Sequence, residues 1–504
     1  MASSDFTLLD VIRRNAQLIP DGTAFVVDDQ RISHGAYARR IEEVAAGLWS
    51  AGLRPGERLA VLAQNCVEFA ELYGAAARLG AIVLPVNWRL AVEEIAYILR
   101  DGAPRFLVAD AERQAVALAG GDGVASIQRR YEIGGDATAH FQSFATLRAA
   151  GGEVPIPGPG AEDGFVIIHT AATDGRPKGA LLPHRALIAA NLQFVAAWHL
   201  ATSDVALGAL PLFHIAGLGL MLAVQHGGGA TVLQAKFDPR AACQAISAEK
   251  VTVLTTFPPM LGGLLDAAGQ TSALASLRAV AGLETPETIQ RLEAACPNAR
   301  FWVGYGQTET TGFVSLAPYR DRPGSAGQPA LLANVAVVDA ADRPLPVGAA
   351  GEIVARGPTI FSGYWNRAVE NAAVFHNGWH HTGDLGRFDE QGFLWYAGRS
   401  PSKELIKPGG ENVYPAEVEQ ALTEHAAVAE ACVIGVPDVE WGEAVKAICV
   451  LAAGETVTVE ALIAFVAARI ARYKKPKHLI FVDALPKTAS GGIDRPAVKQ
   501  RFGG

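Results

Sequence analysis

Two patterns of apolar and polar positions recur along this chain, and stretches with one pattern alternate with stretches that have the other. An apolar residue every three or four positions, as in residues 7–17 and 45–53, predicts amphipathic helices, and short apolar runs between such stretches predict strands. The predicted strands lie at 23–28, 58–62, 81–85, 165–169, 231–233 and 251–255. Strands that alternate with helices favour mainly parallel, doubly wound sheets.

The pattern changes after Gly348, where short strands at 352–355 and 393–397 are separated by Gly/Pro turns and predict a β-rich subdomain. The polar, proline-containing stretch Gly398-Arg399-Ser400-Pro401-Ser402 then predicts a domain boundary. Beyond it lie predicted helices at 415–424 and 459–471 and strands at 431–436 and 447–451. We therefore predict an α/β fold: a large N-terminal domain (1–402) of doubly wound mixed sheets plus a β-rich subdomain, and a small α+β C-terminal domain (403–504).

The composition excludes several classes of protein. Lys and Arg number 43 against 51 Asp and Glu, a net charge of −8, so the basic excess typical of nucleic-acid binding is missing. The longest apolar runs, such as 215–224, are far shorter than the roughly 20 residues of a membrane span, and the start MASSDFTLLDVIRR lacks the order of a secretory signal. The 5 cysteines are scattered and include no CxxC pair, against a disulfide framework or a cysteine zinc site. We expect a soluble, cytoplasmic protein with no nucleic-acid partner and no integral membrane association.

A loop at 170–179 is the first candidate for chemistry, since Walker A, GxGxxG, GxSxG and HExxH patterns are all missing from the sequence. It follows a predicted strand and offers the hydroxyls of Thr170 and Thr173, the flexible Gly175 and the charge of Lys178. Such a loop suits a polyphosphate, and an ordinary surface turn explains it about as well.

Three more segments each carry one polar group with two interpretations. His214 in PLFHIAG is in an apolar stretch, where a histidine is more often a core residue than a functional one. Glu309 in YGQTET can hold a phosphate-bound magnesium ion or cap a helix. Asp384 in HTGD can accept from both hydroxyls of a ribose or simply occupy a turn.

In this order the segments resemble the adenylate-forming acyl-CoA synthetases, a superfamily that also includes firefly luciferase and the adenylation domains of peptide synthetases. The resemblance covers nearly the whole chain, from TLLDVIRRNAQLIPDGTAFV through YGQTET, GYWNR, HTGDLG and KELIKPGGENVYPAEVE to PKTASGGIDR. It implies that a carboxylate attacks the α-phosphate of ATP to give an acyl-adenylate and pyrophosphate. The thiol of CoA would then displace AMP, with Mg²⁺ as cofactor and with ATP and CoA as co-substrates.

The resemblance also implies roles for individual residues. His214 would stand where the acyl pocket meets the thiol channel, Thr308 would touch phosphate, Glu309 would bind magnesium, and Lys403 would be the hinge of a mobile C-terminal domain. Rotation about Lys403 would bring the loop 407–412 to the pantetheine arm of CoA. Nucleotide, acyl-carboxylate and CoA contacts would come from Thr170, Thr173, Gly175, Lys178, Gly282, Tyr305, Gly306, Asp384, Arg399, Gly409 and Gly410.

The sequence departs from the family pattern in its phosphate loop and near its hinge. The loop usually reads close to TSGTTGxPKG, but Ala171 and Ala172 replace a hydroxyl and a glycine, and Asp174 adds a negative charge that should repel ATP. The segment 400–402 stands where a single residue is typical, which should change the rotation rather than the reaction.

The third departure is Gly492, which stands where the family pattern PKTxxGKxxR has a lysine. That lysine stabilises developing charge during adenylation, so its loss should slow this step, while thioester formation from a preformed adenylate need not suffer. Either the substitution is engineered, or the lineage uses another cation, for which Lys487, Lys407 and Lys178 are candidates.

The expected activity is that of an acid:CoA ligase for an apolar monocarboxylic acid, with fatty and aryl acids equally favoured. The apolar stretch 213–224 and Val303 are expected to form the acyl pocket, and we find no Arg or Lys placed to pair a second carboxylate. Two alternatives stay open: an adenylate-forming ligase with a non-CoA acceptor, such as an amine or a carrier-protein thiol, and a non-catalytic relative that only binds nucleotide.

Overall fold

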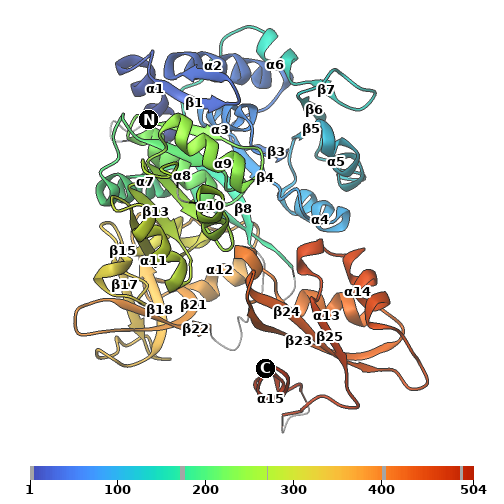
Figure 1. Cartoon of the computed structure of the whole chain (residues 1–504). Coiled ribbons are helices and arrows are strands. Elements are labelled where there is room, and N and C mark those ends of the chain that lie inside the picture. The colour runs from blue at the N-terminus through green and yellow to red at the C-terminus, as the bar shows by residue number, and fades with distance from the viewer. Residues whose placement is uncertain (1–4, 171–175, 270, 400–404, 489–491, 504) are drawn as a thin grey trace.

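The computed structural model describes residues 5–170, 176–269, 271–399, 405–488 and 492–503 (Figure 1). Most strands predicted from the sequence are present within one or two residues of their expected bounds, and β3 (Arg58–Leu62) matches them at both ends. Helices are found on both faces of the two largest sheets, which confirms the predicted doubly wound α/β fold.

The eight-stranded sheet has the strand order β19-β9-β8-β4-β3-β5-β6-β7. Its strands from β8 to β7 pair in parallel, whereas β9 runs antiparallel to β8 and to β19. The bounds are β3 (Arg58–Leu62), β4 (Ile82–Pro85), β5 (Phe106–Asp110), β6 (Arg129–Ile133), β7 (Gln142–Ser143), β8 (Gly164–Thr170), β9 (Lys178–Pro183) and β19 (Gly363–Tyr364).

The nine-stranded sheet has the order β16-β15-β14-β13-β12-β10-β11-β1-β2, parallel from β14 to β1 and antiparallel at both edges. Parallel central strands end on the same side, so the loops after β12, β13 and β14 meet at one edge of the sheet. The bounds are β1 (Thr23–Val27), β2 (Gln30–Ser33), β10 (Val205–Gly208), β11 (Ala230–Leu233), β12 (Val253–Thr256), β13 (Ala279–Gly282), β14 (Arg300–Gln307), β15 (Gly312–Pro318) and β16 (Gln328–Pro329).

Helices fill the space between and around these sheets. The largest apolar cluster packs α2, α3, α7 and α8 with facing strands of both sheets, so it forms one core between them. Helix α2 begins after Ser33, whose side chain accepts from the Ala36 N–H, and ends at Gly52 with left-handed backbone. The helices are α1 (Leu8–Leu18), α2 (His34–Ala51), α3 (Val67–Leu79), α4 (Val92–Gly102), α5 (Gln114–Gly120), α6 (Ala145–Ala149), α7 (His184–Trp198), α8 (Ile215–His226), α9 (Pro239–Glu249), α10 (Met260–Ala268) and α11 (Pro286–Ala295). Among the described helices, none is both long and apolar enough to cross a membrane.

The predicted β-rich subdomain is a five-stranded sheet in which β17, β18, β21 and β20 follow one another and β22 pairs with β21. All of these pairs are antiparallel. The bounds are β17 (Asn334–Val338), β18 (Gly351–Arg356), α12 (Ala368–Val374), β20 (Phe375–His376), β21 (Trp379–Phe388) and β22 (Leu394–Arg399).

The C-terminal domain is a three-stranded sheet, β23-β24-β25, with α13 and α14 against one face and α15 against the other. The predicted helix 459–471 is too long: α14 ends at Ala467, and Arg472–Lys474 forms a short 3₁₀ turn instead. The proposed boundary between 402 and 403 lies outside the described residues and stays a prediction. The bounds are α13 (Pro415–Thr423), β23 (Val428–Asp438), β24 (Gly442–Leu451), α14 (Val459–Ala467), β25 (His478–Phe481) and α15 (Arg495–Phe502).

Candidate functional site

A cavity of about 1860 Å³ lies where the carboxyl ends of β12, β13 and β14 meet the β-rich subdomain and the C-terminal domain. Sites for ligands are typical of this edge of a parallel sheet. Sequence-predicted residues that line it are Thr170, Lys178, His214, Gly282, Tyr305, Gly306, Thr308, Glu309, Asp384 and Gly409. Gly410 follows Gly409 in the same turn, and Arg399 lies opposite Asp384 in the β21–β22 register. Thr173, Gly175 and Lys403 lie outside the described residues.

Three distant segments converge on Glu309, which is only 8% exposed. Its Oε1 accepts from the hydroxyls of Tyr364 (2.7 Å) and Thr170 (3.2 Å), and the Lys178 ammonium lies 5.8 Å from the Tyr364 ring centroid. Burial, and then the Glu309 charge, raise the pKa of Tyr364, so its phenol stays a donor. A buried carboxylate beside a hydroxyl and near a lysine fits a phosphate-bound magnesium ion, which prefers oxygen ligands.

Asp384 organises the neighbouring part of the cavity from β21 and is 2% exposed. Its Oδ2 accepts from the Tyr305 hydroxyl (2.7 Å) and from Nε2 of Gln307 (2.6 Å), and Gln307 also donates to the Thr382 carbonyl (3.0 Å). Tyr396 of β22 stacks on Tyr305 with a centroid separation of 6.1 Å. These contacts hold the carboxylate in one orientation at the cavity wall.

Two glycines keep the wall between these groups flat. At Gly282, where φ is +150°, a Cβ would stand 1.8 Å from the Thr256 carbonyl oxygen, and at Gly306 it would stand 2.0 Å from the Gly312 carbonyl oxygen. Any side chain would therefore displace the backbone of the neighbouring strand.

Glu411 joins the C-terminal domain to the part of the cavity that His214 lines. Its carboxylate pairs with Arg89 and lies 3.3 Å from Nε2 of His214. Burial alone would raise the pKa of Glu411, but its contacts with His214 and with the Arg89 guanidinium hold the pKa below its usual value. Gly409, in the same loop, has left-handed backbone and donates its N–H to the Trp441 carbonyl (3.0 Å). The loop 407–412 therefore lies against the cavity. The family resemblance implied this placement for one of the two positions of the C-terminal domain.

A second contact between the domains is centred on Lys474, which is buried. Its ammonium pairs with Glu94 of α4 and with Glu417 of α13 (2.6 Å to Glu417), and Glu94 also accepts from the Ala471 N–H. Figure 1 shows α13 and α14 on the side of α4, while α15 and the C-terminus lie farther from the N-terminal sheets.

Gly492 is not among the residues that line the cavity in this arrangement, although Arg495 of the same segment is. Gly492 is exposed, and its carbonyl accepts from the Thr488 N–H (2.7 Å). Of the three candidate replacement cations, Lys178 and Lys407 line the cavity, whereas Lys487 pairs with Glu430 (2.6 Å) on the surface.

The predicted acyl pocket is corrected in part. Only one side of the apolar stretch 213–224 lines the cavity, because α8 turns its other side, including Leu218 and Met221, into the core between the sheets. Phe213 is also buried away from the cavity, while Val303 lines it as predicted. The apolar lining includes Leu187, Phe194, Ile215, Leu220, Met260, Val303 and Phe313.

Sequence reasoning missed Tyr364, Gln307 and Glu411. Each belongs to a segment that carries the family resemblance: GYWNR, YGQTET and KPGGEN. The motifs marked the segments, but only the fold shows that Tyr364 and Glu411 reach Glu309 and His214.

Comparison with known proteins agrees with this geometry. The family described as AMP-binding enzyme matches residues 12–365, and the AMP-binding enzyme C-terminal domain matches residues 417–491. A feruloyl-CoA synthase from Amycolatopsis sp is 35% identical, covering 97% of this chain and 98% of the relative. An indoleacetate–CoA ligase from Aromatoleum aromaticum is 36% identical and covers 98% of both chains.

Solved structures show the same fold. A crystal structure from Rhodopseudomonas palustris CGA009, provisionally described as a long-chain-fatty-acid CoA ligase, is 54% identical over 79% of this chain and all of its own, with a TM-score of 0.75. An amide bond synthetase from Marinactinospora thermotolerans is 27% identical, covers 98% of this chain and 99% of its own, and has a TM-score of 0.86.

One relative has been solved in two states. The o-succinylbenzoate CoA synthetase of Bacillus subtilis is 27% identical and covers 98% of both chains. Its double mutant with a CoA product analogue gives a TM-score of 0.87, and its complex with the acyl-adenylate gives 0.71. The arrangement of this chain is thus nearer to the product-analogue complex.

The family resemblance, the fold class and the enzyme class predicted from the sequence are confirmed by these matches. The chain belongs to the AMP-binding enzyme family and is an adenylate-forming, ATP-dependent acyl-CoA synthetase.

Proposed function

We propose that the protein ligates an apolar monocarboxylic acid, fatty or aryl, to CoA through an acyl-adenylate. The observation that carries this proposal is one cavity in which the residues predicted to bind nucleotide and the predicted thiol-channel residue His214 share an apolar wall. The relatives named for feruloyl, indoleacetate and long-chain fatty acids support both acid classes.

Roles for the nucleotide end follow from its contacts. Asp384 would accept the ribose hydroxyls, Lys178 and Thr308 would neutralise and bind phosphate oxygens, and Glu309 with Thr170 would hold magnesium. Magnesium, when bound, supplies positive charge to the phosphates of ATP. Tyr364 keeps the Glu309 carboxylate turned toward the cavity through its 2.7 Å hydrogen bond.

The thiol end favours CoA over an amine acceptor. Exposed basic residues of the C-terminal domain, Arg472, Lys475 and Lys499, line the mouth of the cavity. Cations at this mouth suit the phosphates of CoA, which a simple amine does not have. The competing proposal, amide formation, draws on the structural similarity to the amide bond synthetase.

The test is acid-dependent pyrophosphate release with ATP and Mg²⁺ over a panel of fatty, aryl and dicarboxylic acids, followed by product analysis with CoA or amines. We expect release with apolar monocarboxylic acids and a CoA thioester as product. Dicarboxylic acids belong in the panel because Lys236 lines the cavity from an exposed position. Amide products in place of thioesters, or a preference for dicarboxylic acids, would refute the corresponding part of the proposal.

Replacing Glu411 by Gln should slow thioester formation by about tenfold or more, since removing one partner of a buried charge pair is strongly unfavourable. Arg89 and His214 would lose their shared carboxylate, and the C-terminal domain would occupy the observed arrangement less often. The measurement is a single-turnover reaction of purified acyl-adenylate with CoA. Glu440→Gln, an exposed change in the same domain, is the control and should leave the rate unchanged. An unaltered rate in Glu411→Gln would show that this contact does not support the thiol step.

The pH dependence of the KM for the acid should report on Glu284, which lines the cavity. Burial raises its pKa to about 7, although the Thr256 hydroxyl donates to its Oε1 (3.2 Å). The neutral form therefore predominates at pH 6 and the anion at pH 8. An anionic Glu284 repels a carboxylate substrate, so the KM of an apolar acid should rise by up to about tenfold between these pH values.

Glu284→Gln is the matched variant, and its KM should be nearly independent of pH over this range. The KM for ATP, measured in parallel, separates an effect on the acid from one on the nucleotide. A KM that falls from pH 6 to pH 8 would contradict the apolar assignment, because it would point to an acid whose substituent donates a hydrogen bond to ionised Glu284.

A further inference from the structure

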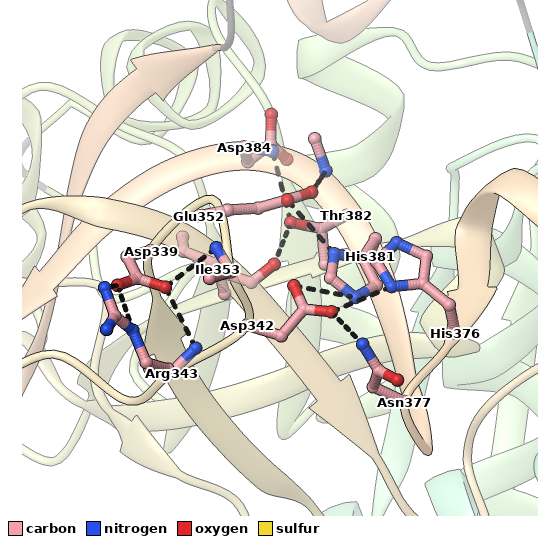
Figure 2. A network of polar contacts seen from close by, with 12 residues as sticks. Asp339, Asp342, Arg343, Glu352, Ile353, His376, Asn377, His381, Thr382 and Asp384 are labelled. Carbon is pink, nitrogen blue, oxygen red and sulfur yellow. Dashed lines mark hydrogen bonds and ion pairs between the residues drawn. The ribbon is translucent and has the colours of Figure 1, made fainter.

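Two histidines and an aspartate meet in the β-rich subdomain, outside the cavity. Asp342 lies between β17 and β18, His376 ends β20, and His381 lies on β21 (Figure 2). One potential ligand atom from each lies within 4.8 Å of the others, and none of the three residues lines the cavity. We call this group the Asp-His-His cluster.

The protonation of His381 is set by Glu352. Nδ1 of His381 lies 3.0 Å from Glu352 Oε2, and a carboxylate only accepts, so Nδ1 carries the proton. Glu352 is held in turn by the Gly383 N–H, which donates to Oε1 (2.8 Å). In the neutral ring, Nε2 is then an unprotonated lone pair. A carboxylate that orients a histidine through the opposite ring nitrogen is a recurring feature of metal ligands.

That lone pair points into the cluster and lacks a hydrogen-bond partner among the described residues. The His381 side chain is only 6% exposed, and Nε2 faces Oδ1 of Asp342 at 3.8 Å. The His381 nitrogen is buried, although Asp342 is only partly buried and His376 is exposed, and two acceptors that face each other are unfavourable unless a cation lies between them.

His376 supplies the third side of the gap. Its Nδ1 lies 2.9 Å from Asp342 Oδ2, and its ring stacks on that of His381 with centroids 3.5 Å apart. Asn377 also donates to Asp342 Oδ2, as Figure 2 shows. With neutral imidazoles, the carboxylates of Asp342 and Glu352 give this group two negative charges. The nearby Arg343 is already paired with Asp339 and so does not balance them.

We propose that Asp342, His376 and His381 bind a divalent transition-metal ion of the zinc class, with Glu352 orienting His381. Two imidazole nitrogens and one carboxylate oxygen are ligands that Zn²⁺ shares with Co²⁺, Ni²⁺ and Cu²⁺, whereas Mg²⁺ prefers oxygen alone. Tetrahedral ligands about 2.0–2.1 Å from zinc lie about 3.3 Å from one another. The observed separations, 2.9 Å from His376 Nδ1 to Asp342 Oδ2 and 3.8 Å from His381 Nε2 to Asp342 Oδ1, end on the two oxygens of one carboxylate, and one potential ligand atom from each residue lies within 4.8 Å of the others.

The metal would stabilise the strand that carries Asp384. His381 and Asp384 are three residues apart on β21, and the ion would tie this strand to β20 and to the turn that contains Asp342. It is separate from the magnesium proposed at Glu309, and the inference does not depend on which acid the enzyme uses.

The test uses the full-length protein, stripped of metal by a chelator and titrated with Zn²⁺ against a chromophoric chelator of known affinity. We expect one high-affinity ion per chain and a rise in the thermal unfolding midpoint on zinc addition. Co²⁺ in its place should give the visible absorption of a low-symmetry site with nitrogen ligands. Excess Mg²⁺ should not compete.

The half-exposed His376→Ala and the isosteric Asp342→Asn should each weaken zinc binding by roughly a hundredfold and abolish the thermal shift. His140→Ala, which removes an exposed histidine elsewhere, is the control and should bind zinc like the parent. Absence of a stoichiometric ion in the parent would overturn the proposal and leave a proton at Nε2 of His381 as the explanation. Binding that survives both cluster variants would overturn it equally.

Discussion

Replacing Glu309 by Gln should reduce acid-dependent pyrophosphate release by about a hundredfold or more, because removing one preorganised charge interaction commonly has an effect of this size. The variant keeps the shape of the side chain and removes its charge. The amide would still accept from Tyr364 and Thr170, so the fold should persist while magnesium loses its carboxylate ligand. The measurement is the steady-state rate at saturating acid and ATP, repeated over a series of Mg²⁺ concentrations.

Two controls make this result interpretable. Thioester formation from purified acyl-adenylate and CoA should be nearly unchanged in Glu309→Gln. Neither pyrophosphate nor the magnesium ion proposed to accompany it takes part in that step. Tyr364→Phe removes only the 2.7 Å hydrogen bond and should have a smaller effect, about tenfold, if Tyr364 acts by orienting Glu309. Release within a few-fold of the parent in Glu309→Gln would exclude Glu309 as the magnesium ligand.

Local pattern was sufficient to predict most of the secondary structure. The run at 58–62 is apolar and bounded by turn residues, and it is strand β3 without change. The error at 459–471 has a physical cause. Its Ala-rich end continues the helical pattern, but the chain turns away after Ala467 and the Ala471 N–H donates to Glu94 across the domain interface. A contact made 377 positions away in sequence leaves no trace in a local pattern.

The sequence motifs identified the segments that form the candidate site, but they did not show how the side chains of these segments are arranged in space. Glu309 and Asp384 stand out because each is a carboxylate inside a recognisable motif, Glu309 just after β14 and Asp384 within β21. The residues that orient them, Tyr364 and Gln307, have no charge and come from other positions in the fold. The Asp-His-His cluster is still harder to find, because Asp342, His376 and His381 belong to separate turns and strands with no ligand-like spacing.

Buried ion pairs hold the two domains in the observed arrangement. Glu411 and Lys474 are both mostly buried between charged partners, so the C-terminal domain cannot leave without exposing Arg89, Glu94 and His214. By the family resemblance, adenylation would use another position of the C-terminal domain, in which the segment around Gly492 would face the α-phosphate. If so, the missing lysine at 492 and the well-paired observed arrangement would act in the same direction, and both would slow the first half-reaction relative to the second.

Replacing Gly492 by Lys should therefore raise acid-dependent pyrophosphate release by about a hundredfold, the usual size of a well-placed charge interaction. The backbone accepts the change: Gly492 lies outside the left-handed region, and a Cβ there would meet Thr488 Oγ1 at 3.5 Å, an ordinary contact. The rate of thioester formation from preformed acyl-adenylate should stay the same, because residue 492 does not line the cavity in the observed arrangement.

A parent enzyme that already releases pyrophosphate rapidly, with no gain in Gly492→Lys, would contradict this prediction and require another cation. Lys487 is then the first to examine, because it moves with the C-terminal domain and its surface pair with Glu430 is of a weak kind, whereas Lys178 is already at the cavity wall. Lys487→Ala would abolish release in that case and leave thioester formation intact. Lys178→Ala would instead weaken ATP binding whichever cation serves adenylation, since Lys178 lines the cavity from the N-terminal domain, with its ammonium 5.8 Å from the Tyr364 ring centroid.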